Sequence, residues 1–302
     1  MNKEQFIEKF ANAIHEGNAA IFAGAGTSVS AGFVNWKELV RPFSEEINLD
    51  VEKETDLISV TQYYINSKQN RGPINQAIVN QFSSQEAETY VMNLLTRLPI
   101  STYWTTNYDI VIEKGLENNN RRADVKRKET NLTYSIPDRD AVVYKMHGDV
   151  FLPEEAVISK DDYARYNDEH SLFVTALRGD LVSKNFLFVG FSFEDPNLDF
   201  ILGKLHVLLG DNQREHFCIQ KKVSRSDFNA PGKSEEDINN EYNYALTKQN
   251  LKINDLKRYG IETVLVEDFS ELPQLILKIE KEYLKNTIFI SGSISEFNTT
   301  WS

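Results

Sequence analysis

The sequence feature that most constrains the fold is a short apolar run that breaks directly into a glycine-rich segment. Residues 19–22 are typical of a buried strand. After them come Gly24, Ala25, Gly26, Thr27 and Ser28. Because glycine has no side chain and tolerates positive φ, backbone N–H groups in such a loop can close on an anionic ligand near a helix start. The pattern predicts a strand that runs into a nucleotide-binding loop, although tight turns in other proteins use the same residues.

Composition limits the class of protein further. The 302 residues can bury a large core, and 18 Phe, 13 Tyr and 3 Trp exclude a disordered chain. A formal net charge of −12 opposes nonspecific attraction to nucleic acid or to an anionic membrane. The single cysteine, Cys218, excludes an internal disulfide and a multi-cysteine zinc site, and its apolar surroundings in the sequence predict a buried thiol. With no membrane-spanning run or signal-peptide pattern, we expect a cytoplasmic protein without nucleic-acid or membrane partners.

Strand-like runs alternate with helical segments along most of the chain. Strands are predicted at residues 19–22, 101–105, 141–146, 186–189, 216–220 and 262–266. Helices are predicted at residues 3–16, 35–47, 108–118, 172–183, 197–209, 236–259 and 272–284. This alternation predicts an α/β fold with a doubly wound, Rossmann-like parallel sheet and a ligand site at the carboxyl ends of its strands. Residues 37–98 stay mostly helical, so we interpret them as a cap inserted into or decorating this domain.

Three polar segments directly follow predicted strands. They read Thr105-Thr106-Asn107-Tyr108-Asp109, Lys145-Met146-His147-Gly148-Asp149 and Gly190-Phe191-Ser192-Phe193-Glu194-Asp195-Pro196-Asn197. A doubly wound sheet brings such strand ends together at one site. The amide of Asn107 can donate to and accept from ribose hydroxyls or an attacking water, and His147 can take a proton near neutral pH.

Two of these residues also have a structural interpretation. Asp109 is either an acceptor for a carboxamide or ribose hydroxyl, or the N-terminal cap of the helix predicted from Tyr108, and the sequence leaves both open. An isolated histidine is by default a core residue, but the place of His147 between a strand and Gly148 favours a functional role. The remaining histidines lack such a setting and are interpreted as structural.

The motifs GAGTS, TTNYD, MHGD and GFSFEDPN, in that order, resemble those of the SIR2-like (sirtuin-type) NAD-binding family over about residues 1–284. More closely, the pattern resembles the NAD-hydrolysing effectors of the Thoeris anti-phage system, in which a SLOG nucleotide-sensing domain follows the SIR2 domain. The resemblance implies that Asn107 and His147 are the pair needed for NAD cleavage. It also implies a pyrophosphate loop of Gly24, Ala25, Gly26 and Thr27, a ribose and nicotinamide contact at Asp109, and adenosine contacts at Gly190 and Ser192.

The chain departs from the classical sirtuin deacylases in two places. Those enzymes continue the glycine loop as Gly-Ile-Pro-Asp-Phe-Arg, where residues 32–36 here read GFVNW, and they carry a four-cysteine zinc module. We therefore expect an NAD+ hydrolase with NAD as its substrate and no metal. A sirtuin-type protein deacylase or ADP-ribosyltransferase, and a non-catalytic NAD-binding sensor, are the alternatives. The residues leave open whether Asn107 or His147 activates the water.

The last residues carry a further expectation. Residues 287–290 are a β-branched apolar run followed by Ser-Gly-Ser, which predicts a strand and a glycine turn. This strand either joins the preceding sheet or begins another domain. We interpret residues 285–302 as the linker and first strand of a truncated SLOG-like regulatory domain after a SIR2-like domain at residues 1–284. The resemblance also implies a homo-oligomer, a tetramer, and a cyclic ADP-ribose-type activator that acts through that further domain, so we expect no response to it from these 302 residues.

Overall fold

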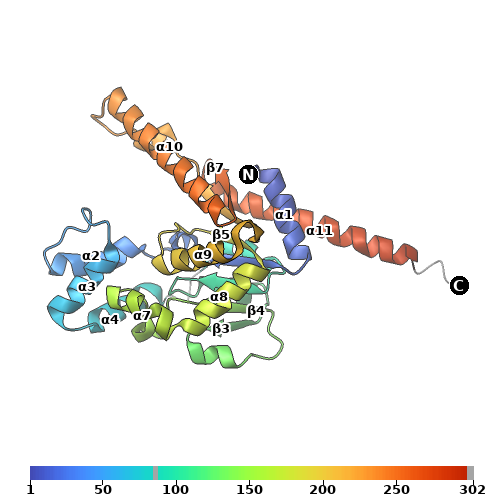
Figure 1. The fold of residues 1–302 in the computed structure, drawn as a ribbon, viewed down its shortest axis with the longest axis horizontal. Coiled ribbons are helices and arrows are strands. Elements are labelled where there is room, and N and C mark those ends of the chain that lie inside the picture. The colour runs from blue at the N-terminus through green and yellow to red at the C-terminus, as the bar shows by residue number, and fades with distance from the viewer. Residues whose placement is uncertain (84–87, 298–302) are drawn as a thin grey trace. The chain divides into compact units, whose positions relative to one another are not determined.

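The computed structural model describes residues 1–83 and 88–297. The described strands form a seven-stranded sheet in the order β3-β4-β2-β1-β5-β6-β7 (Figure 1). Their bounds are β1 Ala19–Ala23, β2 Thr102–Thr105, β3 Ala123–Lys126, β4 Ala141–Lys145, β5 Asn185–Val189, β6 His216–Lys221 and β7 Ile261–Val266. The pairs β1–β2, β2–β4, β3–β4 and β6–β7 run parallel. The sheet and its flanking helices confirm the predicted Rossmann-like α/β fold.

The chain divides into two compact units by its internal contacts. One, here called the central unit, comprises Ala20–Leu181 and Phe188–Ile201. The other, the terminal unit, comprises Met1–Ala19, Val182–Leu187 and Leu202–Ser302. Each unit is described by itself below.

The strands of the central unit end level with one another. In the register of β1 and β2, Ala23 lies beside Thr105, and Thr105 in turn lies beside Lys145 of β4. All five residues of β1 are buried, as expected for a parallel strand covered on both faces. The level ends place the segments that follow β1, β2 and β4 next to one another.

Helices of the central unit cover the sheet and form the predicted cap. Their bounds are α2 Trp36–Glu46, α3 Leu57–Lys68, α4 Gly72–Phe82, α5 Tyr90–Arg97, α6 Val111–Asn118 and α7 Lys160–Glu169, with α8 Ser171–Ser183 and α9 Pro196–Leu209 reaching into both units. The side chains of Asn35 and Asp56 cap α2 and α3 by accepting from backbone N–H groups three residues on. Helices α2, α3, α4 and α7 gather together (Figure 1).

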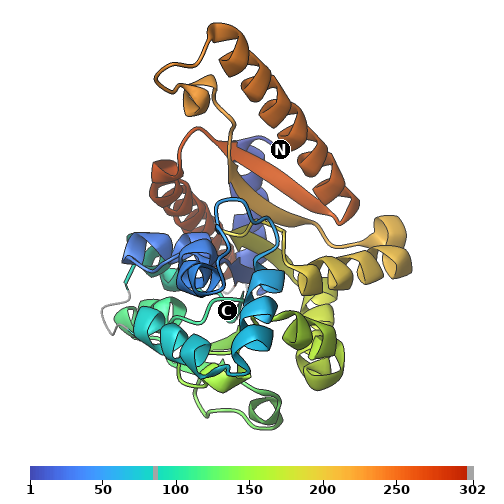
Figure 2. The same ribbon diagram turned by 90° about the vertical axis from the view of Figure 1, so that its left-hand side faces the viewer.

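The terminal unit is built around β6 and β7. Helices α1 Lys3–His15 and α11 Leu272–Phe297 pack against each other, and α10 Glu235–Arg258 lies along β7 (Figure 2). Phe6 and Phe10 of α1 bury their rings against Phe217 of β6, with ring centroids 5.4 and 5.9 Å apart. Cys218 is buried as predicted, and burial raises the pKa of its thiol to about 12.

Three parts of the fold differ from the prediction. Strand β3 was not predicted, because it has only four residues and its two buried positions are the charged residues Asp124 and Lys126. Helix α7 was not predicted either, since its sequence is strongly polar. The strand predicted at residues 287–290 is wrong, because α11 continues through this stretch to Phe297. A helix satisfies its backbone hydrogen bonds internally, whereas a strand needs a neighbour, and an apolar run alone does not distinguish the two.

None of the described helices combines the length and the apolar character needed to cross a lipid bilayer. Within the described residues, no group of three or more His, Cys, Asp or Glu side chains is arranged to hold a metal ion.

Candidate active site

The predicted site segments meet because their strands are neighbours in the sheet. Strands β4, β2, β1 and β5 are consecutive in the sheet order, and each is followed by one of the four motifs. Strand β1 lies where this order reverses, with β2 on one side and β5 on the other. Such a switch point leaves a crevice at the carboxyl ends of the strands.

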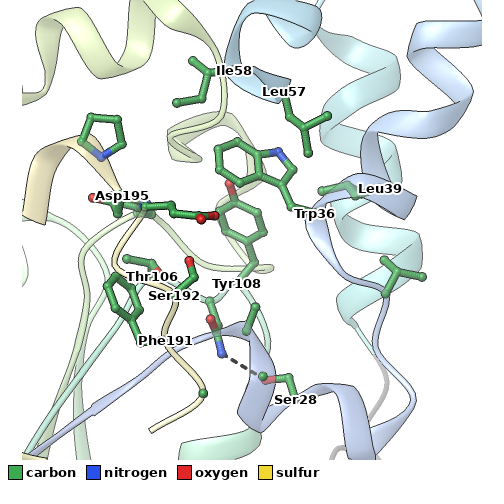
Figure 3. Close-up of a pocket in the computed structure, with 18 of the residues that line it drawn as sticks. Ser28, Trp36, Leu39, Leu57, Ile58, Thr106, Tyr108, Phe191, Ser192 and Asp195 are labelled. Atoms are coloured by element: carbon green, nitrogen blue, oxygen red, sulfur yellow. Dashed lines mark hydrogen bonds and ion pairs between the residues drawn. The ribbon is translucent and has the colours of Figure 1, made fainter. Parts of the chain in front are cut away.

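A cavity of about 760 Å³ opens at these strand ends, within the central unit. At one end, Ser28, Thr106 and Ser192 surround it, and at the other lie the apolar side chains of Trp36, Leu39, Leu57 and Ile58 from the cap (Figure 3). Its volume falls within the range of small-molecule sites. The cavity therefore offers both a polar and an apolar end to one ligand.

The glycine loop is held tightly against the segment after β5. The backbone N–H groups of Gly24 and Gly26 donate to the carbonyl oxygens of Val189 and Gly190, both at 2.9 Å. A Cβ atom on Gly24 would lie 2.5 Å from the Gly190 oxygen, and one on Gly190 would lie 2.5 Å from the Thr27 nitrogen. These glycines are thus required by the close approach of two backbones.

This geometry refines the predicted phosphate loop. Ala25, Gly26, Gly190 and Ser192 line the cavity, whereas Gly24 and Thr27 are buried beneath it. Positive φ occurs at Gly190, at 63°, and not at the two loop glycines. Residues 25–27 form a 3₁₀ turn in which the Thr27 N–H and hydroxyl both donate to the Gly24 oxygen. The loop therefore faces the cavity through Ala25 and Gly26.

Asn107 is fixed with its amide oxygen as the end available to a ligand. Its backbone N–H donates to the Thr105 hydroxyl at 2.9 Å, and its Nδ2 donates to the Gly24 oxygen and the Ser28 hydroxyl, both at 3.0 Å (Figure 3, dashed line at Ser28). A carbonyl oxygen only accepts, so the Nδ2 end must face Gly24. Oδ1 of Asn107, which has no hydrogen-bond partner among the described residues, is left to accept a hydrogen bond from water or a ribose hydroxyl.

His147 is a buried histidine with a carboxylate beside it. It lines the cavity with only 3% of its surface exposed, and burial lowers its pKa, while Asp195 acts in the opposite direction. Its Nε2 lies 3.5 Å from Oδ2 of Asp195 and 3.4 Å from Nδ2 of Asn197. A neutral imidazole with a carboxylate partner can take up a proton near neutral pH.

Asp109 lies both at the start of α6 and at the cavity. Its Oδ1 accepts the Val111 N–H at 3.0 Å, at the start of α6, and the residue also lines the cavity. Its backbone oxygen accepts from Nζ of the fully buried Lys145, which lies 3.4 Å from an oxygen of the equally buried Asp149. Burial acts to lower the pKa of Lys145, but the carboxylates of Glu113 and Asp149 outweigh it and raise that pKa. A buried, charged lysine thus supports the strand ends from below.

Three residues of the site were not predicted. Asp195 had a signal, because it stands among acidic residues directly after β5. Tyr163 and Trp36 had none: Tyr163 is in the unpredicted helix α7, and Trp36 is the first residue of α2, outside every motif that follows a strand. Their rings lie nearly parallel, with centroids 6.4 Å apart, and the buried Nε1 of Trp36 has no hydrogen-bond partner within the described part of the chain. This unpaired donor at the cavity fits a ligand that supplies an acceptor.

Comparison with known proteins gives related sequences over nearly the whole chain. The chain is 49% identical to the NAD(+) hydrolase ThsA of Bacillus cereus over 98% of its own length and 60% of that protein. It is 46% identical to the NAD(+) hydrolase ThsA of Acinetobacter baumannii over 97% of its length and 59% of that protein. It is also 21% identical to the defense-associated sirtuin 2 of Bacillus subtilis, over 74% of the chain and 23% of that protein. The chain thus spans about three fifths of the length of the ThsA proteins that it matches.

The family model of the SIR2-like domain matches residues 101–247. This match includes three of the four motifs at the cavity, those that follow β2, β4 and β5. Together with the parallel sheet and the ThsA relatives, it confirms the family that the motifs indicate. Through this region the chain belongs to the SIR2-like domain family.

Proposed function

We propose that the chain is an NAD+ hydrolase that cleaves the bond between nicotinamide and ribose and releases nicotinamide and ADP-ribose. The observation that carries the proposal is that Asn107 and His147 line one cavity with the glycine loop. The ThsA relatives are named NAD(+) hydrolases, which supports the same reaction.

The chemistry needs few groups. The ring nitrogen of nicotinamide is cationic in NAD+, so it leaves with the bonding electron pair without an acid. Water then adds its oxygen to the resulting ribose cation, and its proton must go to a base. Oδ1 of Asn107 would orient the water or a ribose hydroxyl, and His147 would accept the proton directly or through a ribose hydroxyl. A well-placed proton acceptor contributes ~10²–10⁴-fold to such a step.

The two ends of the cavity suit the two kinds of group in NAD+. We place the pyrophosphate against Ala25 and Gly26, the nicotinamide ribose beside Asp109, and the adenosine near Gly190 and Ser192. Gly24 and Thr27 would act from beneath, by holding the loop in shape. The apolar end would hold a planar ring of NAD+. The unpaired Nε1 of Trp36 would donate to an acceptor on that ring, either a carboxamide oxygen or a ring nitrogen.

The names of the relatives suggest a biological role. A protein named for defence is among them, so we propose that cleavage depletes NAD during anti-phage defence in the cytoplasm. Homo-oligomerisation and activation by a cyclic ADP-ribose-type nucleotide belong to the same proposal, and both rest on the family resemblance alone.

The test is product analysis. The protein is incubated with NAD+, and nicotinamide and ADP-ribose are quantified by chromatography, with Asn107→Ala as the inactive variant. Asn118→Ala, an exposed asparagine on α6 outside the cavity, is the matched control. Equal amounts of both products from the parent and from Asn118→Ala support the hydrolase. Turnover only when an acyl-lysine peptide is added would identify a deacylase, and NAD+ binding without any cleavage would identify a sensor.

A further inference from the structure

The contacts of His147 concentrate on one ring nitrogen. Oδ2 of Asp195 and Nδ2 of Asn197 both approach Nε2, at 3.5 and 3.4 Å, and both residues stand at the start of α9. The side chains of His147 and Asp195 are 4% and 9% exposed, so little water separates them from each other. The amide can satisfy the neutral ring, and the carboxylate can pair with the protonated one.

The carboxylate of Asp195 is itself held from two sides. Its Oδ1 accepts the backbone N–H of Leu198 at 2.9 Å, within the first turn of α9. Its Oδ2 accepts the hydroxyl of Tyr163 at 3.1 Å. The ring of Tyr163 also packs edge-on against the His147 imidazole, with centroids 5.5 Å apart and planes at 83°. Asp195 and the imidazole are therefore fixed relative to each other by a helix start and by an aromatic side chain.

The two tyrosines whose rings pack against the His147 imidazole, Tyr163 and Tyr166, carry no charge near neutral pH. Burial raises the pKa of the Tyr163 and Tyr166 hydroxyls well above the ordinary value. Burial also lowers the pKa of His170, which leaves that ring neutral. Asp195 is thus the charged group among them, and it opposes the burial that disfavours a charged His147.

We propose that Asp195 is a positioning residue for His147: its carboxylate holds the imidazole and stabilises the imidazolium that forms when His147 accepts the proton, while Tyr163 orients the carboxylate. The inference rests on the proposed hydrolysis. In that reaction the oxygen of water bonds to the ribose carbon, nicotinamide leaves with the electron pair, and the released proton moves to His147. The positive charge then lies beside Asp195 in a site with little water, where an ion pair is worth more than at the surface.

Asp195→Asn isolates the charge. Asparagine keeps an oxygen at the Oδ1 position and is an equally good helix cap, so α9 should still begin in the same place. Without the carboxylate, the pKa of His147 should fall further below its ordinary value. We expect kcat for nicotinamide release to drop about ten- to a hundredfold, part of the ~10²–10⁴-fold contribution of a proton acceptor, with KM nearly unchanged. The acidic limb of the kcat profile should move to lower pH.

Two companion variants separate charge from orientation. Tyr163→Phe keeps the carboxylate, so the titration of His147 should not move to lower pH, and kcat should fall about three- to tenfold through the loss of one hydrogen bond. Asp199→Asn removes an exposed carboxylate from the same first turn of α9, outside the cavity. It should leave both kcat and the His147 titration as in the parent.

The decisive measurement is the titration of His147 itself. It is monitored by NMR of histidine-labelled protein, and the signal that is missing in His147→Gln is assigned to His147. It does not require turnover, so it distinguishes failure of this inference from failure of the proposed hydrolase. A titration that shifts to lower pH in Asp195→Asn but not in Asp199→Asn supports the inference. An unshifted titration in Asp195→Asn would overturn it, and so would an unchanged kcat in an enzyme that cleaves NAD+.

Discussion

Two buried histidines, one in each unit, have different surroundings, and only one of them lines the cavity. His147 follows the carboxyl end of β4 in the central unit, and His216 is the first residue of β6 in the terminal unit. Each is 3% exposed, and burial lowers the pKa of both. Burial alone therefore does not mark a site.

The charged side chains beside these two histidines have opposite signs. His147 has the carboxylate of Asp195 beside Nε2 and a cavity in front of it. His216 accepts the Phe186 N–H on Nδ1 at 3.2 Å and has the positive charge of Arg214 nearby. Burial, assisted by Arg214, lowers its pKa to about 3, so it stays neutral as a hydrogen-bond acceptor in the core. In the proposed reaction, the place at a strand's carboxyl end and the carboxylate neighbour let the His147 imidazole act as the base.

Substitution of the two histidines should change the activity by very different amounts. His147→Gln should lower kcat for nicotinamide release by ~10²–10⁴-fold, because it removes the proton acceptor. His216→Gln should leave kcat close to the parent value, since glutamine can still accept the Phe186 N–H. Steady-state kinetics on both variants, with thermal unfolding to show that each is folded, make the test. Similar losses in the two variants would erase the distinction drawn here.

Replacing a glycine by alanine should lower the unfolding free energy more in the central unit than in the terminal unit. Gly190→Ala combines a positive φ with a Cβ placed 2.5 Å from the Thr27 nitrogen, so it should cost about 2–5 kcal/mol of unfolding free energy. Gly232→Ala, at φ +86° with nothing within 4 Å of the added Cβ, should cost about 1–2 kcal/mol. Denaturant titration measures both. Equal costs would mean that the glycine loop and the segment after β5 can separate without penalty.

The low pKa of His216 should make the stability of the fold depend on pH. As pH falls below about 6.5, an unfolded histidine takes up a proton, whereas folded His216 does not until about pH 3. Stability contributed by neutral His216 is therefore fully present above pH 6.5 and is lost as pH falls toward 3. Between pH 7 and 4.5 this amounts to about 2–3 kcal/mol. The unfolding free energy of His216→Gln should fall less over this range than that of the parent, and parallel declines would contradict the assignment.

Patterns local in sequence predicted most of the fold and most of the strand ends that line the cavity. Apolar runs that end in polar motifs located β1, β2, β4 and β5, and the place of Asn107 and His147 at strand ends followed from them. Strand β3 was not predicted, because it depends on pairing with β4, and a local sequence pattern does not reveal such a pairing. The 287–290 prediction failed for the related reason that an apolar run fits a helix as well as a strand.

The partners of the site residues could not be predicted in the same way. Asp195 reaches His147 from the start of α9, and Tyr163 reaches Asp195 from α7, across 48 and 32 residues of sequence. Such contacts depend on how helices pack over the strand ends. The glycine loop shows the same limit, since its glycines are explained by Gly190, a residue distant in the sequence.

We propose that the cavity of the central unit holds NAD+ with its nicotinamide ribose between Asn107 and His147. The most direct test is a crystal structure of His147→Gln with NAD+, because this variant should bind the substrate without cleaving it. We predict one intact NAD+ with its diphosphate against Ala25 and Gly26 and its nicotinamide ribose within hydrogen-bond reach of Oδ1 of Asn107. NAD+ bound outside this cavity, or with that ribose away from both Asn107 and residue 147, would contradict the account.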